Sequence, residues 1–209
     1  MSEEFIVFGA PDISEEDIQA VVATLRSGWL GTGPKVAEFE AALAVYKGVR
    51  SEQMVALNSC TAALHLSLLA AGIGPGDEVI TSPLTFCATA NAILQVGATP
   101  ILVDVDPQTL NLNPAGIQAR ISERTRALLP VHFAGRPCDM SEILALAQRH
   151  ALTVIEDCAH AVEATYRGQP LGTLGDFGCF SFYATKNLTT GEGGMLLAKA
   201  ADKIPRIRM

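Results

Sequence analysis

The feature that most constrains the fold of this chain is a regular alternation of short apolar runs with longer helical segments. The runs are rich in β-branched residues and have the length of strands. They cover residues 54–59, 78–82, 100–105, 127–133, 153–157, 177–182 and 193–197. Helical patterns lie between most of the first five, at residues 60–71, 87–96, 114–121 and 141–150. This order predicts an α/β fold, a three-layer sandwich in which a mostly parallel seven-stranded sheet has helices on both faces.

Two further helices are expected before the sheet. Ser14 and Asp17 have the spacing of a capping box in front of an amphipathic run that ends at Arg26. Pro34 is well placed to open a second helix, which continues to residue 46. The loop WLGTG at residues 29–33 joins them. It is either a plain connector anchored by its tryptophan or a loop that faces a substrate.

Composition narrows the class of protein. The 209 residues are 49% hydrophobic and 18% charged, which is enough for one soluble globular core. A net charge of −7 and scattered arginines argue against nucleic-acid binding. The chain has no apolar run of the roughly 20 residues that a membrane span needs. The acidic N-terminal sequence lacks the features of a signal peptide, so a cytoplasmic location is expected.

Cysteine usage indicates neither disulfides nor a metal site. The five cysteines are odd in number and form no C-x-x-C pair, so they are interpreted as small, reduced core residues: Cys60, Cys87, Cys138, Cys158 and Cys179. Cys60 could instead be a nucleophile, because a helix start lowers the pKa of a thiol. Its neighbour Thr61 explains the position better, as a hydroxyl at a helix N-terminus.

Lys186 is the first candidate for chemistry. It lies in FSFYATKNLTTGEGGM, residues 180–195, between a short apolar strand and a glycine-rich turn. A solvated lysine has a pKa of about 10.4 and rarely attacks a carbonyl at neutral pH, whereas partial burial exposes the free amine for Schiff-base chemistry. A lysine after a strand is more often a plain loop residue, so its neighbours decide. The other lysines lie in polar or helical contexts and are predicted to be on the surface: Lys35, Lys47, Lys199 and Lys203.

Polar groups also follow other predicted strands, where ligands of such sheets bind. The helix beginning at Cys60 offers free N–H groups and the Thr61 hydroxyl, which suit a phosphate, although a plain helix cap would look the same. Asp157 ends an apolar strand, three residues before His160. A buried carboxylate needs a partner. That partner is either a cationic ring nitrogen or N–H groups of the following loop.

Two further residues complete this group. Phe86 could stack on a flat cofactor, or it could be a core residue. Ser181, five residues before Lys186, could supply a second hydroxyl to a phosphate. A phosphate cradle, a carboxylate, an aromatic ring and an amine at one sheet edge together match pyridoxal 5'-phosphate.

The motifs in order resemble the DegT/DnrJ/EryC1/StrS family of pyridoxal-phosphate-dependent sugar aminotransferases, which have the aspartate-aminotransferase fold. The resemblance covers nearly the whole chain: SGWLGTGPKVAEFE, NSCTAALHLSLLAAGIGPGDEVI, TSPLTFCATANAI, GATPILVDVD, LLPVHFAGRPCDM, VIEDCAHAVEA and FSFYATKNLTTGEGGM. It implies transfer of an amino group from an amino acid, usually glutamate, to a nucleotide-linked keto-sugar. It also implies a homodimer.

The resemblance assigns a role to each candidate residue. Lys186 forms the internal aldimine, Asp157 pairs with the pyridinium nitrogen, and Phe86 stacks on the ring. His160 lies near the phenolic oxygen of the ring. The phosphate is held by Thr61, Ala62 and Ser181.

The chain departs from the family at two places. Cys60 stands where many relatives have glycine. Relatives also continue past residue 209 with a smaller C-terminal domain, so residues 1–209 are predicted to be the large cofactor-binding domain with its N-terminal helices, the small domain being absent. Residues 199–209 are expected to begin a helix, with Pro205 near its start.

Two alternatives to an aminotransferase stay open. Sugar dehydratases share the fold, but they carry histidine in place of the lysine, and Lys186 argues against that chemistry. A non-catalytic truncated fragment, which folds or dimerises without turnover, is the second alternative.

Overall fold

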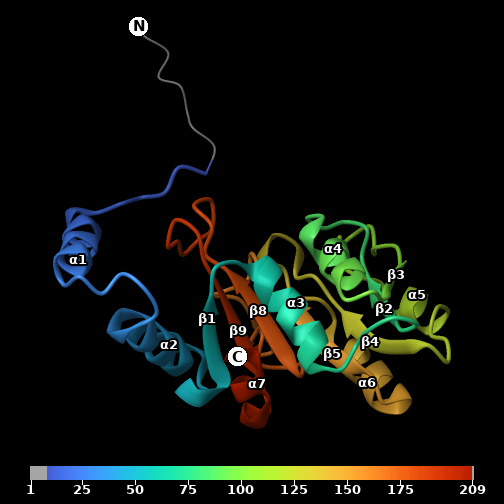
Figure 1. Cartoon of the computed structure of the whole chain (residues 1–209). Helices are drawn as coiled ribbons and strands as arrows, with labels where there is room; N and C mark the ends of the chain where they lie inside the picture. The colour runs from blue at the N-terminus through green and yellow to red at the C-terminus, as the bar shows by residue number, and fades with distance from the viewer. Residues whose placement is uncertain (1–8, 209) are drawn as a thin grey trace, which may run out of the picture.

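The computed structural model describes residues 9–208 and contains a seven-stranded sheet with helices on both faces (Figure 1). Its strands are β1 (Met54–Leu57), β2 (Glu78–Thr81), β3 (Thr99–Leu102), β4 (Thr125–Leu129), β5 (Thr153–Asp157), β8 (Phe177–Ser181) and β9 (Gly194–Ala198). The order is β1-β9-β8-β5-β4-β2-β3. The predicted α/β class is confirmed.

Strand direction places the polar groups that follow the strands at one edge. β9 runs antiparallel to both of its neighbours, β1 and β8, and the remaining pairs in the sheet are parallel. The carboxyl ends of the other six strands therefore meet at one edge, together with the amino end of β9. A short hairpin of β6 (Thr165–Tyr166) and β7 (Gln169–Pro170), which the sequence pattern did not predict, lies outside this sheet.

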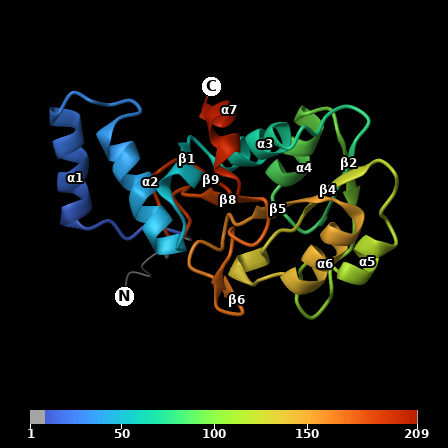
Figure 2. The same cartoon turned by 90° about the horizontal axis from the view of Figure 1, so that it is seen from below.

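All of the helices except α1 form two layers that cover opposite faces of the sheet (Figure 2). The helices are α1 (Glu15–Arg26), α2 (Pro34–Lys47), α3 (Cys60–Ala70), α4 (Ala88–Gln95), α5 (Pro114–Gln118), α6 (Met140–His150) and α7 (Ile204–Arg208). One apolar core packs beneath α3, α4 and α7, and another beneath α2, α5 and α6. Side chains that alternate along β9 divide between them: Leu196 belongs to the first core, Met195 and Leu197 to the second.

The N-terminal helices begin where their caps predict. Ser14 Oγ accepts a hydrogen bond from the Asp17 N–H at 3.2 Å, and Asp17 Oδ2 accepts one from the Ser14 N–H at 2.9 Å, which completes the capping box. Pro34 is the first residue of α2. Trp29 Nε1 donates to the Thr32 carbonyl at 3.1 Å, so the loop between the helices closes on itself. α1 lies beyond α2 from the sheet and has no buried residue.

Two prolines affect the bounds of secondary-structure elements. One ends a strand earlier than predicted, and the other lies near the start of a helix, as predicted. β4 ends at Leu129 rather than continuing to residue 133, because Pro130 has no N–H to donate to a neighbouring strand. Beyond it a single bridge joins Val131 to Asp157. Pro205 occupies the second position of α7, within the first turn, as expected. α5 is shorter than predicted and ends at Gln118.

The structure corrects two predictions of exposure. Lys47 is only 2% exposed, whereas the sequence context predicted a surface lysine. α2 turns this residue toward the sheet, where Nζ donates to the Leu171 carbonyl at 2.9 Å and lies 4.6 Å from the centre of the Phe180 ring. Burial lowers the pKa of Lys47, and nearby acidic groups partly oppose that shift. Cys87, predicted to be a core residue, is exposed, whereas the other four cysteines are buried as expected.

Among residues 9–208, no helix has both the length and the apolar character needed to cross a membrane.

Candidate active site

A cavity of about 530 Å³ lies at the edge of the sheet where the strand carboxyl ends meet. It brings together residues that follow five different strands, although they are spread over more than half of the sequence. Six of the seven predicted site residues line it: Thr61, Phe86, Asp157, His160, Ser181 and Lys186. The seventh, Ala62, is not among the lining residues.

The start of α3 forms one wall of the cavity. The Ala62 N–H donates to Ser59 Oγ at 3.1 Å, so the helix cap already occupies that donor. Cys60 and Thr61 are the first two residues of the helix, and their N–H groups have no carbonyl partner within it. At Gly194, the first residue of β9, a side chain would collide with the backbone of Ser59 and Cys60. Glycine therefore lets the strand pass directly beside this donor-rich helix start.

Lys186 reaches the cavity from the loop after β8. It is half-buried, and its Nζ lies 2.7 Å from Nε2 of His160. Burial lowers the pKa of Lys186, and the nearby Cys60 and Asp157 partly oppose that shift. The pKa of His160 is lowered by burial and by the cation of Lys186. Two positive charges at this distance repel each other, so Lys186 and His160 together carry one positive charge and not two. The amine of Lys186 is therefore neutral more often than that of a solvated lysine, which makes it a better nucleophile.

Asp157 lies at the end of β5 and is only 5% exposed. Its Oδ2 accepts a hydrogen bond from Thr89 Oγ1 at 2.8 Å, and its Oδ1 accepts one from the Ala159 N–H at 3.1 Å. Burial raises the pKa of Asp157, while these hydrogen bonds and the charge of Lys186 act in the opposite direction. The Ala159 N–H belongs to the loop after β5, so one of the two predicted kinds of partner, a loop N–H group, is present. Thr89 was missed, although it lies one helical turn after Thr85 in the motif around Phe86.

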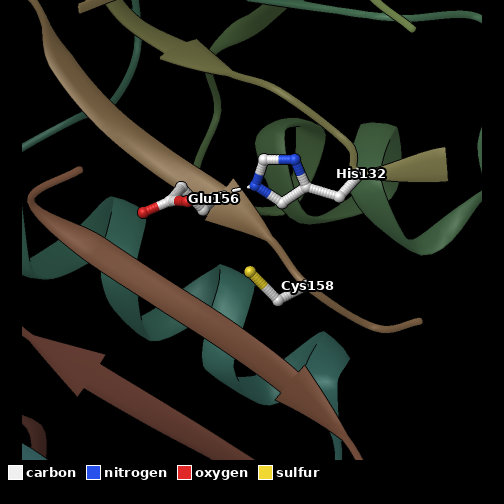
Figure 3. A group of neighbouring side chains, drawn as sticks. All are labelled: His132, Glu156 and Cys158. Carbon is white, nitrogen blue, oxygen red and sulfur yellow. Dashed lines mark hydrogen bonds and ion pairs between the residues drawn. The ribbon is translucent and has the colours of Figure 1, made fainter. Parts of the chain in front are cut away.

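The neighbouring Glu156 is held by a different and more complete set of donors. Its Oε1 accepts from the N–H groups of Leu174 and Gly175 at 2.9 and 2.7 Å. Its Oε2 lies 3.0 Å from the Gly172 N–H and 3.0 Å from Nε2 of His132 (Figure 3). Burial would raise the pKa of Glu156, but the hydrogen bond from His132 and the loop N–H groups outweigh it and lower the pKa. A buried carboxylate satisfied by loop N–H groups is therefore found one residue before Asp157.

The proton on His132 can be assigned from its partners. Nδ1 accepts a hydrogen bond from the Cys138 N–H at 3.1 Å, so the ring proton lies on Nε2 and points to Glu156. If both ring nitrogens carried a proton, the Nδ1–H would point at the Cys138 N–H, and two donors would face each other. His132 is accordingly neutral, and Glu156 carries the negative charge of the pair.

Cys158 adds a third potential metal ligand to this buried group, and the ligand atoms all lie within 4.8 Å of one another (Figure 3). The histidine nitrogens and carboxylate oxygens are already engaged in hydrogen bonds. Burial raises the pKa of the Cys158 thiol well above its usual range, which disfavours the thiolate that a metal needs. The geometry favours a hydrogen-bonded support beneath the cavity over a metal centre.

Two alternatives considered for single residues lose support from the geometry. Phe86 is 77% exposed, so it is not a core residue. Burial raises the pKa of Cys60 well above its usual range, the reverse of the shift that a nucleophilic thiol at a helix start requires.

Comparisons with known proteins agree with this fold. The model of the DegT/DnrJ/EryC1/StrS aminotransferase family matches residues 11–209. The spore coat polysaccharide biosynthesis protein SpsC of Bacillus subtilis (strain 168) is 54% identical over 98% of this chain and 52% of its own length. The UDP-4-amino-4-deoxy-L-arabinose–oxoglutarate aminotransferase of Shewanella sediminis is 46% identical over 100% of this chain and 53% of its own.

A solved structure of a sugar aminotransferase has a similar fold. The putative sugar aminotransferase Spr1654 from Streptococcus pneumoniae, in its PLP form, superposes with a TM-score of 0.91 at 38% identity. The match covers 96% of this chain and 57% of that one. The chain spans about half the length of the curated relatives it matches.

Proposed function

The chain belongs to the DegT/DnrJ/EryC1/StrS aminotransferase family, and from this membership we propose that its cavity binds pyridoxal 5'-phosphate. The reaction that we propose is transfer of an amino group from an amino acid, expected to be glutamate, to a nucleotide-linked keto-sugar. One observation carries the proposal. The half-buried amine of Lys186 and the buried carboxylate of Asp157 open into the same cavity.

The residues present fit this cofactor. A cavity of about 530 Å³ is within the usual range for small-molecule sites. The N–H groups of Cys60 and Thr61, at the positive end of α3, suit a phosphate, and Gly194 keeps the approach to them clear of side-chain atoms. The Thr61 and Ser181 hydroxyls are proposed as further phosphate ligands. Ala62 stays a predicted ligand, although its N–H is bonded to Ser59.

Each remaining residue has a task that its surroundings support. Pyridoxal phosphate supplies a ring that accepts electrons from the Cα of a bound amino acid. Asp157 would hold a proton on the ring nitrogen, because a buried carboxylate favours a cationic partner. Lys186, once neutral, can take up and return the Cα proton, and His160 lies close enough to exchange that proton with it. Phe86, exposed at the cavity, is proposed to stack on the ring.

Substrates and assembly are proposed from the family. The relative from Shewanella sediminis is named for a UDP-linked amino sugar and for oxoglutarate, the product that glutamate leaves after donating its amine. We propose that residues 1–209 form the large cofactor-binding domain of such an enzyme, and that the enzyme acts as a homodimer. The apolar side chains that α1 exposes, including Val21 and Leu25, are consistent with an interface. A cytoplasmic location remains a prediction.

The cofactor and its lysine can be tested together. The purified chain is mixed with pyridoxal phosphate, its visible absorption is recorded, and it is reduced with borohydride and mapped by peptide mass spectrometry. We expect a visible band and a label on Lys186 in the wild type, and neither in Lys186→Ala. The exposed Lys199 provides a control, because Lys199→Ala should behave as the wild type.

Addition of glutamate to the loaded wild type tests the first half of the transfer. Up to one equivalent of 2-oxoglutarate per bound cofactor is expected. A label on another lysine, or no band in the wild type, would contradict the cofactor proposal for this chain. A normal label with no 2-oxoglutarate would instead favour the non-catalytic alternative.

A further inference from the structure

A chain of two threonine hydroxyls leads to Asp157. Thr89 Oγ1 donates to Asp157 Oδ2 at 2.8 Å, and Thr85 Oγ1 lies 2.7 Å from Thr89 Oγ1. Thr89 is 1% exposed in α4, whereas Thr85 is half-buried just before that helix, and both line the cavity. The two threonines are separated from Asp157 by about 70 residues of sequence, so only packing of α4 on the sheet brings them together.

The direction of these hydrogen bonds depends on the charge of Asp157. An ionised carboxylate can only accept, so the single proton of the Thr89 hydroxyl is committed to Oδ2. Thr89 can then only accept from Thr85, and both hydroxyl dipoles point toward the carboxylate. If Oδ2 were protonated, the hydrogen bond between Asp157 and Thr89 would have to reverse, and the carboxyl would donate to the Thr89 hydroxyl. Since hydrogen bonds to a charged acceptor are about twice as strong as neutral ones, the chain of hydroxyls favours the ionised state.

We propose that Thr89, oriented by Thr85, is a positioning residue for Asp157, which it holds ionised and directed into the cavity. The inference rests on the proposed function, because an ionised carboxylate matters there for its pairing with the ring nitrogen. Thr89 itself acts only through Asp157. Within residues 9–208, it is the only side-chain donor hydrogen-bonded to Asp157.

Other ionisable groups around Asp157 do not replace this donor. They are Lys186, His160, His132, Cys60, Cys138, Cys158 and Cys179. His132 is neutral, and burial raises the pKa of each of these four thiols, which keeps them uncharged. Lys186 is the cation of the group, but its proton is shared with His160. Removal of the Thr89 hydroxyl should therefore have a measurable effect on Asp157.

The first experiment needs no cofactor. The chain is labelled with 13C at the aspartate carboxyl carbons, Asp157 is assigned with Asp157→Asn, and its titration is followed by NMR. In Thr89→Val, which keeps the shape but loses the hydroxyl, the midpoint should rise by about one pH unit or more. The sign follows from the pKa: burial already raises it, and loss of a donor that stabilises the charged form raises it further.

Three further variants complete the set. Thr89→Ser restores the hydroxyl and should restore the midpoint. Thr81→Val removes another buried threonine hydroxyl, which donates to the Leu129 carbonyl at 2.8 Å, and should leave the midpoint unchanged. Thr85→Val should raise it by a smaller amount and keeps the test available if Thr89→Val does not fold. An unmoved midpoint in Thr89→Val, or an equal rise in Thr81→Val, would overturn the inference.

A second measurement separates this inference from the proposed function. Spectroscopic titration with pyridoxal phosphate at pH 7 should show about tenfold weaker binding for Thr89→Val than for the wild type, with Thr89→Ser near the wild type. If the wild type binds no cofactor while the NMR midpoint shifts as expected, the proposed function fails for this chain and the role of Thr89 stands. If the wild type binds the cofactor normally and the midpoint does not move in Thr89→Val, the role of Thr89 fails and the proposed function stands.

Discussion

Glu156→Gln provides the sharpest test of the hydrogen-bonded support beneath the cavity. Glu156 is fully buried and accepts four hydrogen bonds, two at each carboxylate oxygen. Glutamine has the same shape but only one acceptor oxygen, so its NH2 group must face two of these donors in either orientation. Each buried donor left without an acceptor costs about 1–3 kcal/mol, and the substitution should therefore lower the free energy of unfolding by about 2–6 kcal/mol.

His132 cannot relieve this cost by moving its proton. With the proton on Nδ1, its Nε2 could accept from the new amide, but the Cys138 N–H would then lose its acceptor. The number of unsatisfied donors would stay the same. After this exchange the glutamine oxygen still accepts from Leu174 and Gly175, and the Gly172 N–H stays without an acceptor.

The measurement is urea unfolding at pH 7, followed by circular dichroism, for the wild type and Glu156→Gln. Glu52→Gln is the matched control, because Glu52 is exposed and, in the part of the chain that the structure describes, pairs only with the exposed Arg50, an interaction worth about 0–1 kcal/mol. A loss below about 1 kcal/mol for Glu156→Gln, or a gain, would refute the reasoning. A small loss would mean that relief of the buried charge nearly offsets the lost hydrogen bonds, and a gain would mean that it outweighs them.

Two further predictions concern packing. Lys47→Met keeps the buried side-chain volume and removes a desolvated cation, so its free energy of unfolding should stay within about 1.5 kcal/mol of the wild type. Lys47→Ala leaves a cavity and should lose about 2–4 kcal/mol. Equal losses for the two variants, measured by urea unfolding, would contradict this. Gly194→Ala forces Cβ against the backbone at the start of α3 and should cost about 1–3 kcal/mol and weaken cofactor binding. Gly31→Ala, which meets no atom within 4 Å, is the control, and a Gly194→Ala chain as stable as Gly31→Ala would disprove the close approach.

Much of the fold and part of the site could be predicted from local sequence. The seven apolar runs became the seven strands of the sheet, and the caps at Ser14 and Pro34 marked two helix starts. Because parallel strands end at one edge, polar residues after separate strands were expected to meet. The structure brings Thr61, Asp157 and Lys186 to one cavity.

Other parts could not be predicted, because they depend on contacts between distant segments. The polar character of Lys47 is visible in the sequence, but its burial follows from the way α2 packs against Phe180 and the Leu171 carbonyl. The reversed direction of β9 leaves no local pattern, because a buried antiparallel strand is as apolar as a parallel one.

The sequence by itself determined the alternation of strands and helices, the helix caps and the chemical types of residue that follow each strand, because these depend on propensities and spacing over a few residues. Tertiary structure alone decided which groups share protons and which charges are buried. Lys186 meets His160 across 26 residues, and Glu156 meets His132 across 24. Hydrogen bonds and desolvation act over a few ångströms in space, so the pKa values of Asp157 and Lys186 were settled only when the sheet brought their partners together.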